Sequence, residues 1–394
     1  MTYDPINISF AVQFDYPVLF VEDAFDPDDP GLARIFDRLE EGRRHRVAVV
    51  LDSGVNDARP ELARSIEAYF HAHSDQIEMA GPLEIFSGGP AAKKGYDRLE
   101  HTIWNLGNLH MDRQSFVLAI GGGSVLDAVG LAVSLVHRGL RLVRMPTTVL
   151  SQCDAGIGVK NGVDEHEQKN FLGTFAPPFA VINDLSLLTS LDDLHWRSGI
   201  AEAFKVALIR DRDFFDFLCR HAAALRERDY ALMSELIHRC AAIHLNHIGT
   251  AGDPFEMGSA RPLDFGHWAA HRLEIMSQHR MGHGQSVAIG IALDCDYAHR
   301  HGLLSEAERD AIFDALEAAG LPTYVADLSR RRPDGELQIL QGLADFREHL
   351  GGRLTVTMPD GIGHSIELHH LSADQIEAGI KALAARAGED PACT

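Results

Sequence analysis

Several features that mark whole classes of protein are scarce or missing in this chain. The five cysteines are widely scattered and form no CxxC pair, which predicts free thiols in a reducing compartment. The N-terminus has no basic stretch followed by a small-residue cleavage site, and no apolar run reaches the length of a membrane span. We therefore expect a cytoplasmic protein without a membrane partner.

Positive charge is also in short supply. Lysine and arginine total 36 against 57 aspartates and glutamates, so the formal net charge is −21. This balance argues against nucleic acid or an anionic membrane as a partner. A negatively charged substrate would need a local basic cluster in an acidic surface, so any Lys or Arg close to a glycine-rich loop is of interest.

Repeats and low-complexity linkers are absent as well, although 394 residues are many for one hydrophobic core. Two domains with a tight boundary are predicted, at residues 1–184 and 185–394.

The first half of the chain alternates between β-branched apolar runs and amphipathic helices. Strands are predicted at 45–51, 81–86, 116–120, 141–145 and 179–183, with a hairpin of two short strands at 6–14 and 16–21 before them. Strands that alternate with helices indicate a doubly wound parallel sheet, whose ligand binds at the carboxyl ends of the strands. The fold class predicted for this half is therefore an α/β nucleotide-binding domain.

A glycine-rich turn follows the strand at 116–120. Gly121, Gly122, Gly123 and Ser124 lead into a predicted helix at 125–138, and such a turn can present backbone N–H groups to a phosphate. The spacing is not GxGxxG, so it lacks the usual dinucleotide fingerprint. The alternative is a tight connection without a ligand. The stretch from 152 to 170 is polar and is predicted to be a loop, either part of a site or simply solvated.

From about residue 185 the pattern becomes helical. Helices are predicted at 198–210, 213–227, 230–246, 266–277, 285–301, 305–319 and 336–349, and only 353–358 and 364–368 are predicted to be extended. A largely α-helical second domain would leave a cleft beside the first.

Histidines and a buried-looking ion pair make the second half chemically interesting. His267 and His271 share a helix face, and His283 lies between two glycines at a predicted bend, so three imidazoles could hold a divalent metal. Chance spacing is the alternative, because the chain has 22 histidines. Glu202 and Lys205 share one face of an apolar helix, either as a partly exposed ion pair or as a metal ligand beside a phosphate-binding lysine.

Seven motifs, in order along the chain, resemble those of the 3-dehydroquinate synthase superfamily of sugar phosphate cyclases. They are SGGPAAK at 87–93, GGGSVLD at 121–127, PTTVLSQCDAGIGVK at 146–160, KNFLGTF at 169–175, RSGIAEAFK at 197–205, LDFGHWAAH at 263–271 and HGQSVAIG at 283–290. The resemblance covers about 52–368 and implies a homodimer of chains with a nucleotide-binding α/β domain and a helical domain. It also implies NAD and a divalent metal, typically Zn²⁺, with Co²⁺ as a second possibility.

The resemblance assigns roles residue by residue. The implied metal ligands are Glu202, His267 and His283. The implied cofactor-binding residues are Asp52, Gly88, Lys93, Gly122, Gly123, Ser124, Asp127, Thr147 and Thr148. The implied catalytic and substrate-binding residues are Asp154, Lys160, Lys169, Asn170, Lys205 and His271, with His271 as the proton handler. Arg138 matches an Arg that reaches the phosphate site of the partner subunit.

The implied reaction has no net oxidation. NAD takes a hydride from a secondary alcohol of the sugar, phosphate is eliminated, the hydride returns, and an intramolecular aldol step closes the ring.

Departures from the family pattern bear on the substrate. Dehydroquinate synthases carry an Arg and an Asn at the positions of Ala260 and Asp264, and a Lys near His244 or Asn246. A second family Lys aligns with Arg347. With fewer cations and an added aspartate, the site is hostile to a carboxylate. A neutral sugar with Asp264 as a hydrogen-bond acceptor is expected, which favours sedoheptulose 7-phosphate and a valiolone-type product, on the 2-epi-valiolone synthase branch.

Three rival interpretations remain at the level of the sequence. A 3-dehydroquinate synthase acting on the heptulosonate 7-phosphate shares every main motif. A metal-dependent polyol or alcohol dehydrogenase shares the glycine loop and the PTT strand, but such enzymes typically place Asp and His at Glu202 and Lys205. A non-catalytic binding protein on this fold is the third, and the complete metal and phosphate constellations argue against it.

Overall fold

The computed structural model describes residues 5–166, 168–250, 253–256, 262–349 and 351–389. Its first half is built on a seven-stranded sheet in the order β1-β9-β6-β5-β2-β3, with β4 also paired to β2, and all of these pairings are parallel. The strands are β1 (Val18–Val21), β2 (His45–Asp52), β3 (Ile77–Met79), β4 (Glu84–Phe86), β5 (Phe116–Gly121), β6 (Arg141–Pro146) and β9 (Ala180–Asp184). The central strands are continuous apolar runs because helices cover both of their faces.

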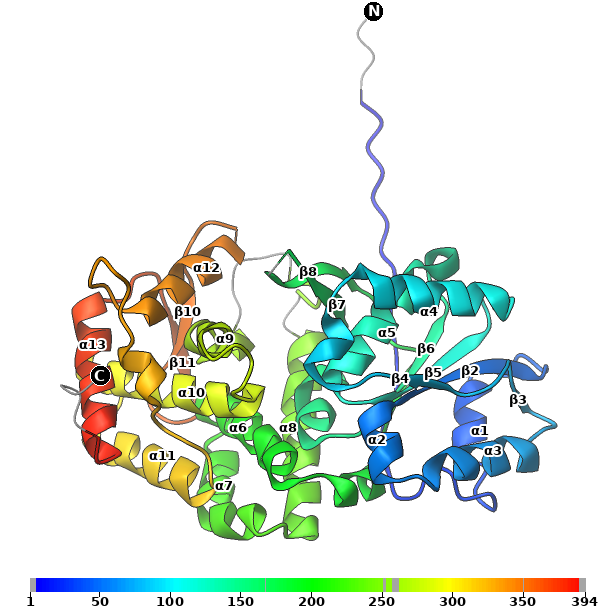
Figure 1. The fold of residues 1–394 in the computed structure, drawn as a ribbon, viewed down its shortest axis with the longest axis horizontal. Coiled ribbons are helices and arrows are strands. Elements are labelled where there is room, and N and C mark those ends of the chain that lie inside the picture. Colours follow the sequence, from blue (N-terminus) through cyan, green and yellow to red (C-terminus); the bar gives the residue numbers. More distant parts are fainter. Residues whose placement is uncertain (1–4, 167, 251–252, 257–261, 350, 390–394) are drawn as a thin grey trace, which may run out of the picture.

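Each face of the sheet has its own core. Helices α1 (Gly31–Phe36) and α3 (Leu62–Ala72) pack on one face, and α4 (Tyr96–Asn108) and α5 (Gly123–Leu135) pack on the other (Figure 1). Alternate side chains of one strand enter different cores: Leu118 belongs to the first and Val117 to the second. The prediction of a doubly wound α/β half is confirmed, and the carboxyl ends of its strands form the edge where ligands bind in such sheets.

The second half is mainly helical. Its helices are α6 (Asp193–Arg210), α7 (Arg212–Arg226), α8 (Tyr230–Thr250), α9 (His267–Met276), α10 (His283–Arg300), α11 (Glu306–Ala318), α12 (Gln341–His349) and α13 (Ala373–Arg386), with a hairpin of β10 (Val356–Pro359) and β11 (Ser365–Leu368). Helix α6 is buried on nearly every side, between α7, α8 and α10. The sequence interpretation missed α13 and β3. The boundary at 184/185 stays a prediction.

Two predictions of local structure were wrong. Residues 5–15 form no strand and are exposed, and β1 pairs in parallel with β9 instead of closing a hairpin. The polar stretch after Gln152 is a loop only in part: residues 156–159 are turns and bends, but from Lys160 it forms the antiparallel hairpin of β7 (Lys160–Glu165) and β8 (Gln168–Phe175). Val163 and Leu172, on one face of this hairpin, pack against the core beside α5. Few apolar residues are therefore needed, and their alternation is too sparse to see in the sequence.

None of the helices in the described part of the chain combines the length and the apolarity that crossing a bilayer requires.

Candidate active site

Three side chains from three helices meet at the centre of the helical half. Glu202 lies in the middle of α6, His267 begins α9 and His283 begins α10. The Nε2 atoms of His283 and His267 lie 3.4 Å and 3.7 Å from Oε1 of Glu202. Glu202 is fully buried, and its Oε1 accepts no hydrogen bond from the described residues, whereas Oε2 is paired with Lys205. Two imidazoles and a buried carboxylate with one unsatisfied oxygen fit a divalent cation with open positions.

Close packing of α10 against α6 positions His283. A Cβ atom on Gly284 would lie 2.2 Å from the backbone oxygen of Ser198, so only glycine lets the two helices approach this closely. Gly282 is the N-cap of α10, and His283 is the first helical residue instead of the bend that the two glycines predict.

Both imidazoles are oriented by hydrogen bonds at Nδ1. The Nδ1 atom of His267 lies 3.1 Å from the backbone oxygen of Phe265, and that of His283 lies 3.1 Å from Oε1 of Glu274. Each contact leaves Nε2 free to face Glu202, the arrangement that metal-ligating histidines usually show. The sequence interpretation missed Glu274. The signal for it was a carboxylate three positions after His271 on the same face of α9.

Two of the three candidate ligands, Glu202 and His267, take the protonation state that suits a metal. Burial opposes the negative charge on Glu202, but Lys205, His283 and His267 outweigh burial and lower the pKa of the carboxyl to about 2. Burial, together with Lys205, lowers the pKa of His267 and favours neutral imidazole. A carboxylate and a neutral imidazole are the ligand forms that cations bind. Burial opposes the positive charge on His283, but Glu274 and Glu202 outweigh burial and raise the pKa of His283 to about 9, so a bound cation would displace its proton.

A buried ionic network continues from the metal cluster toward the sheet. The Nζ atom of Lys205 lies 2.5 Å from Oε2 of Glu202 and 3.3 Å from Oδ2 of Asp154. On the other side of Asp154, Oδ1 lies 3.4 Å from Nε2 of His244. Lys205 is 1% exposed, so the alternative of a partly exposed ion pair is wrong. Buried charges of this kind persist where both members are held by several partners.

The β7–β8 hairpin supplies the other predicted cations. Lys160, at the start of β7, lies 2.6 Å from Oε1 of Glu256, and Lys169, on β8, pairs with Glu274. Asn170 accepts a hydrogen bond of 2.5 Å from Lys93. Asp264 is partly buried, and its charge interacts most strongly with Lys160 and then with His267. Sequence-distant residues of both halves are thus brought to one site.

His271 lies beside both histidine ligands. Its ring centroid is 5.3 Å from that of His267 and 6.1 Å from that of His283. Burial, together with the charges of His267 and Lys169, holds the pKa of His271 well below its usual range. The ring is therefore neutral and a weak base, and its protonated form would return a proton readily.

The predicted cofactor residues gather at the carboxyl ends of four neighbouring strands. Asp52, at the end of β2, accepts hydrogen bonds from the backbone N–H groups of Gly54 and Gly122. Gly122 caps α5, so the first amides of that helix, at Gly123 and Ser124, face the strand ends. Thr147 and Thr148 follow β6, where the buried hydroxyl of Thr147 has no hydrogen-bond partner among the described residues.

Close packing also fixes the loop after β4. A Cβ atom on Gly88 would lie 2.0 Å from a carboxylate oxygen of Asp52, so any larger residue would displace that carboxylate from its hydrogen bonds to Gly54 and Gly122. The next turn carries Lys93, which lies 2.7 Å from Asp127 on α5. All nine predicted cofactor residues therefore surround the strand ends and the start of α5.

Family models match most of the chain. The 3-dehydroquinate synthase N-terminal model matches residues 85–198, and the C-terminal model matches residues 199–339. The chain belongs to the 3-dehydroquinate synthase family. This finding confirms the resemblance seen in the motifs.

Relatives in this family include proteins with different names. The 2-epi-5-epi-valiolone synthase of Streptomyces hygroscopicus subsp. jinggangensis is 31% identical over 96% of this chain and 90% of the relative. The 2-epi-valiolone synthase of Actinosynnema mirum is 34% identical over 71% of this chain and 72% of the relative. A 3-dehydroquinate synthase of Ruegeria sp. is 32% identical over 82% of this chain and 84% of the relative. Overall identity therefore does not separate the substrate classes.

A solved structure extends the comparison to the fold. ValA, the 2-epi-5-epi-valiolone synthase from Streptomyces hygroscopicus subsp. jinggangensis 5008 with NAD⁺ and Zn²⁺ bound, has a TM-score of 0.86 and 30% identity. The match covers 97% of this chain and 100% of that chain. The dehydroquinate synthase-like fold is thereby confirmed over nearly the whole length.

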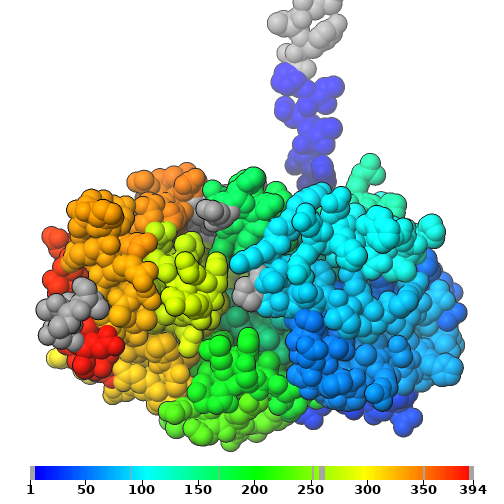
Figure 2. All heavy atoms as spheres, viewed as in Figure 1, coloured from blue at the N-terminus to red at the C-terminus, as the bar shows by residue number. Residues whose placement is uncertain are grey.

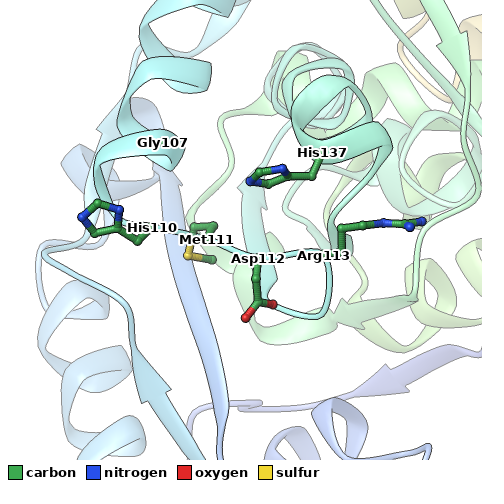
Figure 3. A pocket seen from close by; sticks show the side chains of 6 residues that line it. All are labelled: Gly107, His110, Met111, Asp112, Arg113 and His137. Atoms are coloured by element: carbon green, nitrogen blue, oxygen red, sulfur yellow. The ribbon is translucent and has the colours of Figure 1, made fainter.

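Two arginines predicted from the family pattern lie apart from the cluster. Arg138 is exposed in the turn at Val136–Arg138, at the opposite end of α5 from Gly122. A depression of about 450 Å³ beside this turn is lined by His137 and the end of α4, and includes none of the predicted site residues (Figure 3). Arg347 is exposed on α12 and forms no ion pair among the described residues. The position of Ala260 lies outside the described residues.

Arg144 is a further residue that the sequence interpretation missed. Its fully buried guanidinium donates hydrogen bonds to the backbone oxygens of Gly156, Gly158 and Lys160, and to Oδ1 of Asn161. The segment between Asp154 and Lys160 therefore wraps around one cation on β6. The sequence shows Arg144 only as a charged residue inside a predicted strand, and the strand pattern does not indicate which groups the arginine binds.

Proposed function

We propose that this family member is a sugar phosphate cyclase that converts sedoheptulose 7-phosphate, a ketose phosphate without a carboxylate, into a valiolone-type cyclitol. The proposal uses NAD and one divalent cation, Zn²⁺ or Co²⁺, held by Glu202, His267 and His283. The likeness to ValA supports this proposal, as do relatives named valiolone synthases.

One observation carries the choice of substrate: each lysine of the site already faces a carboxylate. Lys205 faces Glu202 and Asp154, Lys160 faces Glu256, and Lys169 faces Glu274. Asp264 adds a further negative charge close to Lys160. A substrate carboxylate would therefore meet Asp264 and no unpaired lysine among the described site residues, whereas a neutral hydroxyl can donate to Asp264.

NAD supplies a reversible hydride acceptor, and the cation polarises a substrate oxygen. His271 accepts and returns a proton beside the sugar ring, because it is neutral and adjacent to two metal ligands. Asp154 and Lys205 fix each other at the base of the site, so Lys205 stays oriented toward the substrate.

Phosphate binding falls to Lys160, Lys169 and Asn170 on the β7–β8 hairpin. The substrate phosphate would compete with Glu256 and Glu274 for the two lysines. Arg138 lies at the far end of α5, so we assign it to the phosphate site of the partner subunit in a homodimer. Free thiols at Cys153, Cys219, Cys240 and Cys295 suit the cytoplasm, where we place the enzyme.

The proposal is tested by a paired assay of purified protein with NAD and Zn²⁺. Phosphate release and absorbance of NADH are followed with sedoheptulose 7-phosphate and with the heptulosonate 7-phosphate. We expect phosphate release from the first sugar only, without net NADH. Release from the carboxylated sugar alone would make the chain a 3-dehydroquinate synthase. Net NADH formation with a polyol, without phosphate release, would make it a dehydrogenase.

A further inference from the structure

The first described residues form an arm that leaves the body of the protein. Side chains at every second position are large and apolar: Ile6, Ile8, Phe10, Val12 and Phe14 are 91%, 82%, 83%, 63% and 56% exposed. The residues between them are small or polar and none is charged. The arm projects away from the folded chain (Figure 2), and residues 5–14 form no hydrogen bond with the described residues. This alternation is that of a strand with one face to bury.

The base of the arm is firmly attached. Arg38 donates to the carboxylate of Asp15 over 3.0 Å, and the hydroxyl of Tyr16 donates to the backbone oxygen of Ile157 over 2.9 Å. Val12 and Phe14, at the end of the arm, line an apolar groove of about 560 Å³ together with Phe255, and the rings of Phe14 and Phe255 lie 5.8 Å apart. Residues 10–14 include none of the common turn residues Gly, Pro, Asn, Asp and Ser, so this stretch has no preferred site at which to turn back on its own body.

A surface that suits such an arm lies beside its base. Strand β8 is the outer strand of its hairpin, and no other strand pairs with it in the part of the chain that the structure describes. Its Phe171 and Phe175 are 49% and 43% exposed, and Phe175 stacks on Phe255 at 5.7 Å. An unpaired strand edge with exposed aromatic side chains is a template for another strand.

We propose that the arm is an exchanged strand, in which Ile6, Ile8 and Phe10 pack on β8 of a second copy of this chain and in its Phe255 groove, beside that copy's own Val12 and Phe14. The second copy returns its own arm in the same way, so the contact is two-fold and closed.

The net charge of the chain and the length of the arm favour a second copy of this chain as the partner of the arm. Two chains of net charge −21 repel each other, and an uncharged arm is a part through which they can approach. Ten extended residues reach about 33 Å, which is enough to cross an edge strand of a neighbour.

The location also links the arm to the site. The hydroxyls of Ser134 and Thr174 lie 2.9 Å apart, which joins β8 to the end of α5 just before the turn of Arg138. The same strand carries Lys169 and Asn170. A copy held on this face would thus lie close to Arg138. Only this last link rests on the proposed function, because the exchange itself needs no substrate.

Two double variants test the proposal, and each adds the same negative charge to a different face of the arm. Ile8→Asp with Phe10→Asp changes the apolar face of the arm, and Asn7→Asp with Ser9→Asp changes the polar face. Sedimentation of the full chain should give a dimer for wild type and for the polar-face variant. The apolar-face variant should dissociate at least about tenfold more readily, since it loses two buried anchors. A monomeric wild type, or equal dissociation of both variants, would overturn the proposal.

A cross-linking measurement identifies the occupant directly. A photoreactive phenylalanine at position 10 is placed in one copy, which is mixed with a longer, tagged copy that lacks the probe. We expect a covalent product between the two copies that maps to the β8 or Phe255 region of the tagged copy. A link that stays within one chain, or one that maps elsewhere, would contradict the exchange. Neither measurement depends on catalysis, so the proposed function can fail independently.

Discussion

Glu274 and Asp294 support the candidate metal cluster of Glu202, His267 and His283 without being among its proposed ligands. Glu274 holds Nδ1 of His283, and Asp294 accepts hydrogen bonds from the backbone N–H of Gly266 and the indole N–H of Trp268. These two donors lie on either side of His267. The positions of the ligands therefore depend on carboxylates contributed by α9 and α10 themselves.

Replacing Glu274 with Gln should weaken metal binding by about 10–100-fold, the usual effect of losing a partner of a ligating histidine. The reason is that His283 loses the charged acceptor that orients its ring. Competition with a coloured chelator measures the affinity. Glu235→Gln serves as a control, because Glu235 is half exposed on α8 and forms an ion pair with Arg239 alone among the described residues. Equal affinities of the Glu274 variant and wild type would refute the role.

Asp294 should make the stability of the fold depend on pH. Burial raises the pKa of this carboxyl from 3.8 to about 7. The folded state therefore keeps a proton that the unfolded state releases, and the stabilisation is complete below about pH 4 and lost as the pH rises through about 7. Relative to Asp294→Asn, wild type should lose on the order of 4 kcal/mol of unfolding free energy between pH 4 and pH 7. Parallel denaturant curves with no such divergence would show that Asp294 is ionised in the fold.

Helices and strands are predicted best from the sequence where the apolar pattern is long and marks one buried face. The central strands and most helices follow from apolar periodicity. The Glu202, His267 and His283 set follows from the family motifs. The β7–β8 hairpin could not be predicted, because polar residues dominate it and one buried cation on β6 organises the segment before it. The arm was predicted as half of a hairpin, since alternation shows a strand but not its partner.

Arg144→Gln should destabilise the protein by about 3 kcal/mol or more, because several buried backbone oxygens lose a charged donor. The rate of amide hydrogen exchange in residues 156–161 should also be higher in this variant than in wild type. Arg46→Gln provides a matched control, since Arg46 also donates to two backbone oxygens but from a side chain that is 36% exposed. If both variants lose the same stability, Arg144 has no special role in ordering the segment.

Removing the metal should loosen three helices together, because the ligands come from α6, α9 and α10. Free Zn²⁺ at 100-fold above its dissociation constant should stabilise the apoprotein by about 2.7 kcal/mol. Thermal unfolding with a chelator and with added Zn²⁺ measures this difference. The effect should vanish in Glu202→Gln. The same stabilisation in that variant would place the ion at other histidines.

At the scale of the whole molecule, two halves with different periodicities were predictable, and their assembly into one site was not. The spacing of residues in the sequence does not predict that Asp154 of the first half contacts Lys205 and His244 of the second half. Those contacts depend on how the helical half packs against the strand ends. The excess of acidic residues also shapes the site, because Lys160, Lys169 and Lys205 are each paired with a carboxylate.

We propose that Asp264 directs this site to a sugar without a carboxylate. The most direct test is the ratio of kcat/KM for sedoheptulose 7-phosphate to that for the heptulosonate 7-phosphate, measured for wild type and for Asp264→Asn. We predict a large ratio in wild type and a fall of at least about tenfold in the variant, since one close repulsive charge is worth more than 1.4 kcal/mol. A wild-type ratio below one, or a ratio that Asp264→Asn leaves unchanged, would contradict the claim.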